Sequence, residues 1–207
     1  IASPYPHAPM MALADGLPAR EDAWMFAEPV RLDAGLNGMT LFPSAYLDVT
    51  SAEATALMPA LNAQFAADQI SFHLGQEGRW YVRHPVGETP ITHSIESAKI
   101  GMAAKLLPQS SGKLNWSAIQ NEAQMVLHHH PVNEAREADG KPTINGIWFW
   151  GGGTVPADTT AISEVDIVAT DSPLVTQLAA HAGLRVTAAG PLELFALPEN
   201  AASTSLL

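Results

Sequence analysis

Hydrophobic positions along this chain alternate between a period of two, typical of strands, and a period of about 3.6, typical of helices. The strand-like alternation predicts two antiparallel hairpins. Their strands are expected over 24–32 and 38–42, with the turn at Ala34–Gly38, and over 70–74 and 80–84. A further strand of bulky residues is predicted over Thr143–Trp150, in the middle of the sheet and ended by Gly151–Gly153.

Helical periodicity predicts three helices between these strands. The first follows the capping box Thr50-x-x-Glu53, and its apolar face carries Ala54, Leu57, Met58, Leu61 and Phe65. Pro59 lies inside this helix, so the helix either kinks there or begins later. The second is expected over Trp116–His129, and Pro131 ends it. The third is a short helix over Pro131–Asp139, stopped by Gly140.

The last third of the chain carries a weaker pattern. It predicts a strand over Glu164–Ala169, a helix from Asp171 to a stop at Gly183, and edge strands over Val186–Ala188 and Leu194–Leu197. Hairpins followed by helices favour an α+β fold with a mixed or antiparallel sheet and with helices packed mainly on one face.

Proline and small polar residues mark the two ends. Residues 1–23 hold Pro4, Pro6, Pro9 and Pro18, so we expect an extended arm with at most a short helix near Met10–Ala14. Residues 198–207 are expected to form a tail. The single α+β domain is therefore predicted over 24–197.

Composition restricts the classes of function. Ten Lys and Arg against 21 Asp and Glu give a net charge of −11, which disfavours a nucleic-acid or anionic membrane surface. The chain has no cysteine, which excludes thiolate zinc sites, iron–sulfur clusters and thiol catalysis. No apolar run approaches the roughly 18 residues that a membrane helix needs. We expect a cytoplasmic protein.

Most familiar chemical motifs are missing or incomplete. Leu107–Leu114 lacks the first glycine and the Ser/Thr of a phosphate-binding loop, and Pro156 replaces the last glycine of a dinucleotide loop that would begin at Gly151. His128, His129 and His130 point about 100° apart on a helix, so they cannot converge on one ion. The pattern predicts no catalytic residue, no metal site and no cofactor.

One cluster combines residue types that suit an anion. His130, Asn133 and Arg136 lie close together in the sequence, and Arg136 can clasp a carboxylate or a phosphate at two points. Trp150 and the backbone N–H groups of Gly151, Gly152 and Gly153 would complete such a site. The structural alternative stays open. In it Asn133 caps a helix, and Arg136 pairs with an acidic side chain, for which Glu122, Glu134, Glu137 and Asp139 are candidates.

The same residues carry a family resemblance. The runs Asn121–Arg136 and Gly140–Gly153, with their H-P-V-N-x-x-R and W-x-W-G-G-G blocks, resemble the signature of a bacterial family called "regulatory protein, RpfE type". That family is described as cofactor-independent phosphoglycerate mutase-like. It is similar in turn to the substrate-capping domain of archaeal-type phosphoglycerate mutases, two-metal enzymes of the alkaline phosphatase superfamily. The resemblance covers roughly 24–185 and implies an α+β cap domain.

The sequence departs from that pattern in two ways. No segment resembles the metal-binding core of the mutases, and the chain is a candidate fragment because family members run longer at both ends. The family's D-P-V-H-L-R-A-D block reads Glu28-Pro-Val-Arg-Leu-Asp-Ala-Gly35 here, so no ligand role is assigned to it.

We therefore predict a non-catalytic binding or regulatory domain for a small phosphorylated or carboxylate metabolite. The first alternative is a structural or protein-interaction module that binds a protein partner. The second is part of a metal-dependent mutase or phosphohydrolase whose catalytic core lies outside this chain.

Overall fold

The structure is a computed structural model of the 207-residue chain. It describes residues 6–35, 38–98, 103–157, 167–170, 175–176, 179 and 183–187. The chain falls into two compact units, Ile1–Val155 and Pro156–Leu207, a division that differs from the predicted single domain over 24–197. The predicted tail, 198–207, lies outside the described residues.

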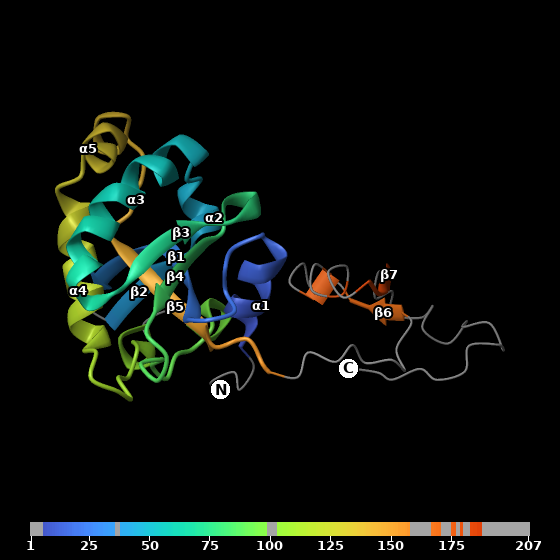
Figure 1. The fold of residues 1–207 in the computed structure, drawn as a ribbon. Coiled ribbons are helices and arrows are strands. Elements are labelled where there is room, and N and C mark those ends of the chain that lie inside the picture. Colours follow the sequence, from blue (N-terminus) through green and yellow to red (C-terminus); the bar gives the residue numbers. More distant parts are fainter. Residues whose placement is uncertain are drawn as a thin grey trace. The chain divides into compact units, whose positions relative to one another are not determined.

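A five-stranded antiparallel sheet forms the centre of the first unit (Figure 1). Its strands are β1 Ala23–Gly35, β2 Gly38–Phe42, β3 Ser71–Leu74, β4 Trp80–His84 and β5 Gly146–Gly153. The long strand β1 pairs with β2, β4 and β5, and β3 pairs with β4. Both predicted hairpins are confirmed, although part of the first turn, 36–37, lies outside the described residues.

The position of β5 corrects the sequence-based prediction. Among the strands that the structure describes, β5 pairs with β1 and no other, so it lies at a sheet edge and not in the middle. It also continues through the glycines to Gly153 instead of ending at Trp150. Phe149 and Trp148 are each about 1% exposed because packing on the two faces of the sheet, not flanking strands, covers them.

Helices α3 Ser51–Phe65 and α4 Trp116–His128 cover one face of this sheet and build the main core with it. The predicted apolar face of α3 is buried, and the Thr50–Glu53 capping box is formed. Pro59 lies inside a continuous helix. The short helix α5 Pro131–Ala138 follows α4 directly, with His130 as its N-cap residue. The main core therefore forms where the 3.6-residue pattern placed it.

The opposite face carries a second layer. Helix α1, His7–Ala14, contacts β1 and β5 and buries Ala8, Met11 and Ala12. It is longer than the helix expected near Met10–Ala14, and this part of the predicted arm is packed and not extended. The 3-10 helix η4, Ala103–Leu106, packs beside Trp148 and Trp150. Trp148 and Trp150 thus share a face opposite Phe149, as the alternation predicts.

Short segments join these layers. They are α2 Ser44–Leu47 and the 3-10 helices η1 Ala66–Asp68, η2 Gln76–Gly78 and η3 Ile95–Ser97. No helix of the described residues has the length and apolar character needed to cross a membrane.

The second unit contains a parallel strand pair. β6 Ile167–Ala169 pairs with β7 Arg185–Thr187. Residues 175, 176 and 179 between them are helical, and Gly183 has φ +75°, which fits the predicted helix stop. Asp171 and the expected strand at Leu194–Leu197 lie outside the described residues.

Candidate functional site

Asn133 is a buried connector between three segments. Its side chain is 3% exposed. The amide nitrogen donates to the carbonyls of Leu127 at 2.8 Å and Ile144 at 2.7 Å, and the amide oxygen accepts from the Ile144 N–H at 2.8 Å. Asn133 therefore joins the end of α4 to the segment before β5, and these bonds occupy its amide.

Arg136 is engaged on every side. Its side chain is 2% exposed, and Nη1 donates to Glu53 Oε1 at 2.8 Å. Nε donates to the Pro142 carbonyl at 2.7 Å, and Nη2 donates to the Leu47 carbonyl. The buried charge is thus paired, but the partner is Glu53 of α3 and none of the predicted candidates.

Hydrogen bonds also set the charge of Glu53. Burial acts to raise the pKa of this carboxyl. The hydrogen bonds from Thr50 and Arg136 outweigh burial and lower the pKa below its ordinary value. Glu53 is therefore the ionised partner that the Arg136 guanidinium requires.

The His130 ring and the glycines Gly151–Gly153 form no hydrogen bond with the side chains of Asn133 and Arg136. His130 caps α5, where its Nδ1 accepts from the Val132 N–H at 3.2 Å. Gly151–Gly153 lie at the far end of β5, more than about 15 Å along the strand from Ile144 at about 3.3 Å per residue. There a Cβ on Gly152 would contact Met25, and one on Gly153 would contact Pro6.

The geometry of this cluster therefore matches the structural alternative. Arg136 and Asn133 have no exposed donor to offer a ligand, and the glycines that were expected to complete the site serve close packing elsewhere. Trp150 packs on Phe26, with ring centroids 4.5 Å apart, and its indole N–H donates to Glu28 at 3.3 Å.

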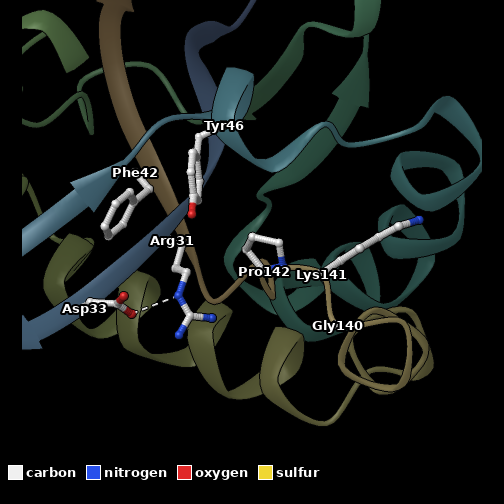
Figure 2. A pocket seen from close by; sticks show the side chains of 7 residues that line it. All are labelled: Arg31, Asp33, Phe42, Tyr46, Gly140, Lys141 and Pro142. Carbon is white, nitrogen blue, oxygen red and sulfur yellow. Dashed lines mark ion pairs between the residues drawn. The ribbon is translucent and has the colours of Figure 1, made fainter.

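An open cavity lies beside this cluster. It has a volume of about 310 Å³ and is lined by Arg31, Asp33, Phe42, Tyr46, Gly140, Lys141 and Pro142. We call it the Arg31 cavity (Figure 2). Arg31 and Asp33 stand two residues apart near the end of β1 and share one face of the strand, and Tyr46 comes from α2. In Figure 2 the Lys141 side chain points away from the Arg31 guanidinium, so Arg31 is the cation that is available inside the cavity.

The polar groups of the Arg31 cavity suit a small hydroxylated anion. Arg31 Nε lies 2.9 Å from Asp33 Oδ1, and Nη1 donates to Thr143 Oγ1 at 2.7 Å. Nη2 has no hydrogen-bond partner among the described residues, and the Arg31 side chain is 32% exposed. The Phe42 and Tyr46 rings, 5.0 Å apart, form an aromatic wall. A carboxylate or phosphate can bind Nη2, while Asp33 and the Tyr46 hydroxyl can bind hydroxyls.

A second cavity has a volume of about 230 Å³. It is lined by Phe26, Glu28, Pro29, Ser44, Glu77, Gly78, Arg79, Trp80 and Trp150. Glu28 accepts from Ser44 Oγ at 2.7 Å. Within the described parts of the chain, no group of three or more His, Cys, Asp or Glu side chains is arranged to hold a metal ion.

Sequence reasoning missed the Arg31 cavity although a signal for it was present. Arg31 and Asp33 stand two residues apart at the end of a predicted strand, so they share a face. The other wall, Gly140–Pro142, is more than one hundred residues away, and no local pattern brings it there.

Comparisons with known proteins relate the chain to one part of larger enzymes. No protein-family model matches it. It is 33% identical over 116 residues to the 2,3-bisphosphoglycerate-independent phosphoglycerate mutase of Methanosarcina barkeri, and 32% identical over 116 residues to that of Methanosarcina mazei. Each alignment covers 54% of this chain and 28% of the mutase. The chain therefore matches little more than a quarter of these relatives.

A solved structure confirms the fold. The cofactor-independent phosphoglycerate mutase of Thermoplasma acidophilum superposes with a TM-score of 0.53 at 17% identity, covering 89% of this chain and 52% of that protein. The chain thus has an α+β fold that matches part of a cofactor-independent phosphoglycerate mutase.

Proposed function

We propose that this chain is a non-catalytic binding domain with a regulatory role, and that it binds a small phosphorylated or carboxylate metabolite in the Arg31 cavity. The observation that carries the proposal is the partly exposed Arg31 guanidinium, whose Nη2 has no protein acceptor among the described residues. The distant similarity to phosphoglycerate mutases supports a hydroxylated acid as the ligand class. The resemblance to RpfE-type proteins and to a mutase cap domain supports a regulatory binding role.

The charge of the whole chain limits the strength of this binding. A net charge of −11 repels anions at long range, so recognition depends on short-range contacts inside the cavity. Two-point binding of an anion to Arg31 would require the guanidinium to release part of its contact with Asp33 or Thr143. We therefore expect modest affinity and a strong dependence on Arg31.

The first prediction tests this site with 3-phosphoglycerate as the probe. Arg31→Gln removes the charge and the free donor, so we expect the affinity to fall by about tenfold or more, in line with the loss of a charge-assisted hydrogen bond. Titration calorimetry or NMR titration measures it. Arg83→Gln is the matched control, because Arg83 is a partly exposed arginine paired with Asp22 at 3.2 Å and does not line the cavity.

Three outcomes of this titration decide the proposal. Loss of binding in Arg31→Gln with retention in Arg83→Gln supports it. Equal loss in both variants would assign binding to general charge. Failure of the unmodified protein to bind 3-phosphoglycerate or inorganic phosphate would contradict it and favour the protein-interaction module.

A second candidate function is part of a phosphoglycerate mutase or phosphohydrolase. It is favoured by the names of the relatives, of which the alignments cover 28%. The assay is turnover of 3-phosphoglycerate or an aryl phosphate by the purified chain with Mn²⁺ or Zn²⁺. Activity that survives repurification and is abolished by a chelator would establish this candidate and overturn the non-catalytic proposal.

A further inference from the structure

We infer that Arg136 is a positioning residue that holds the two walls of the Arg31 cavity at a set separation. The expected effect of Arg136 on ligand affinity rests on the proposed function, whereas its contacts with the two walls do not. One wall is α2 with Tyr46, and the other is the segment Gly140–Pro142. These walls are almost one hundred residues apart in the sequence, so a tertiary contact must hold them together.

The Arg136 guanidinium supplies that contact. It donates to the carbonyl of Leu47, the residue after Tyr46, and at 2.7 Å to the carbonyl of Pro142, which lines the cavity. A planar guanidinium with fixed donor directions can bind both carbonyls only when they stand in one relative position. The walls are thus joined from behind by a residue that no ligand reaches, since Arg136 is 2% exposed.

Glu53 fixes the guanidinium itself. Its Oε1 accepts from Arg136 Nη1 at 2.8 Å, while its Oε2 accepts from the Thr50 backbone N–H at 2.8 Å and from the Thr50 hydroxyl at 2.9 Å. Each carboxylate oxygen therefore has its own partner. The capping box of α3 holds the carboxylate, the carboxylate holds Arg136, and Arg136 holds both walls.

A separate contact attaches the second wall to the strand that carries Arg31. The Asn145 side chain accepts from the Leu32 N–H at 2.7 Å and donates to the Leu32 carbonyl at 2.9 Å, next to Arg31 in β1. Arg31 itself donates to Thr143 at 2.7 Å. The signature residues Arg136 and Asn145 thus form a frame around the cavity, because they bond to backbone groups at or next to residues that line it. Because the cavity walls are already fixed before binding, less conformational entropy is lost when a ligand binds.

The absence of native cysteine makes the wall separation directly measurable. The pair Tyr46→Cys and Lys141→Cys puts spin labels on the two walls, at side chains that are 57% and 55% exposed. Double electron–electron resonance without ligand then reports the distance distribution. Ligand affinity is measured separately in unlabelled protein that retains Tyr46 and Lys141.

The test variant is Arg136→Lys. Lysine keeps the charge opposite Glu53 but cannot reach two carbonyls with fixed planar donors. We expect a broadened or lengthened distribution between the labels and an affinity for 3-phosphoglycerate reduced by about tenfold, the size of one lost positioning contact. Glu53→Gln is the second variant if Arg136→Lys fails to fold. Glutamine retains the capping box, so the helix survives while the hold on Arg136 weakens.

Arg79→Lys is the matched control. Arg79 pairs with Asp15, whose side chain is 2% exposed, through Nε at 3.0 Å and Nη2 at 2.5 Å, and it does not line the Arg31 cavity. It should leave both the label distance and the affinity unchanged. An unaltered distribution in both Arg136→Lys and Glu53→Gln, or equal broadening in Arg79→Lys, would overturn the inference.

The experiment also separates the two proposals. A distribution that broadens in Arg136→Lys, in a protein that binds no 3-phosphoglycerate, sustains the positioning role and defeats the proposed ligand. Binding that depends on Arg31 but not on Arg136, with unaltered label distances, sustains the proposed ligand site and overturns the positioning role of Arg136.

Discussion

At the scale of single residues, burial decides what a polar side chain does. Asn133 and Arg136 have the chemistry of an anion site, but at 3% and 2% exposure their donors serve internal carbonyls and Glu53. Arg31 has the same guanidinium at 32% exposure beside an open cavity. A buried donor that lacks an acceptor is costly in free energy, so donors in the interior are paired with protein acceptors. A donor at a partly exposed position can stay unpaired in the protein and is available to a ligand.

His84 provides a prediction at this scale. Its ring is 1% exposed, packs edge-on against Trp116, and has Nδ1 3.1 Å from the Pro85 carbonyl. Burial lowers the pKa of His84 to about 4 from 6.5, although the Pro85 carbonyl and the charges of Glu88 and Asp22 act to raise it. Between these two pH values the unfolded chain binds a proton that the folded chain does not. Stability is therefore retained above pH 6.5 and falls as the pH drops toward 4.

We expect this proton to lower the free energy of unfolding by at most about 3 kcal/mol across that window. Urea unfolding at pH 7.5 and at several lower pH values measures the slope. His84→Gln should flatten it, and the exposed His129→Gln should not. His7 and His73, whose pKa values burial also lowers, act in the same direction and leave a residual slope. An unchanged slope in His84→Gln would disprove this assignment.

At the scale of elements, β5 shows that one strand can bury both faces without lying in the middle of a sheet. Phe149 faces the core under α3 and α4, and Trp148 faces the cluster that includes η4. The glycines that follow still belong to the strand, and at Gly152 and Gly153 neighbouring side chains occupy the space that a Cβ would need. A run of bulky residues in a strand therefore predicts that both of its faces are buried, but it does not predict that strands flank it on both sides.

The glycine prediction separates packing from ligand binding. A Cβ on Gly152 would lie 2.5 Å from Met25 Cγ and 2.8 Å from a Thr89 methyl carbon. We expect Gly152→Ala to destabilise the first unit by about 1–3 kcal/mol through overpacking. Gly35→Ala is the control, because that strand glycine has room for a Cβ, with the Gly38 carbonyl oxygen at 3.6 Å. Thermal unfolding measures both, and equal stability of the two variants would contradict the packing role.

At the scale of the whole molecule, the main hydrophobic cores lie within the first of the two compact units. The core clusters around Phe149 and Trp148 consist of residues between Met25 and Trp150, all inside Ile1–Val155. Each cluster is built by segments distant in sequence, such as β1 with β5. A unit with its own core is expected to unfold cooperatively by itself.

Truncation tests this independence. We expect a chain that ends at Val155 to retain one cooperative thermal transition, with a midpoint within about 5 °C of the full chain, a shift equivalent to roughly 1 kcal/mol. A chain that ends before Gly146 lacks β5 and should lose that transition, because the buried faces of β1 and α4 would be exposed. Circular dichroism and calorimetry give the comparison. Loss of cooperativity in the Val155 truncation would show that the units fold as one.

Local patterns determined the elements and the fold class of this protein. The capping box at Thr50, the alternation in both hairpins and the apolar stripe of α4 depend on residues within a few positions of one another. Short-range rules of periodicity and capping therefore recovered them from the sequence. The face shared by Trp148 and Trp150 followed from the same alternation.

Only the tertiary structure decided the strand order and the site. The edge position of β5, the pairing of Arg136 with Glu53 and the cavity between Arg31 and Gly140–Pro142 each join segments far apart in the chain. Sequence spacing carries no distance across such gaps, and several acidic residues could have paired with Arg136 equally well. Packing selected Glu53, because the turn that begins α3 brings its carboxylate to the one face of α5 that is buried.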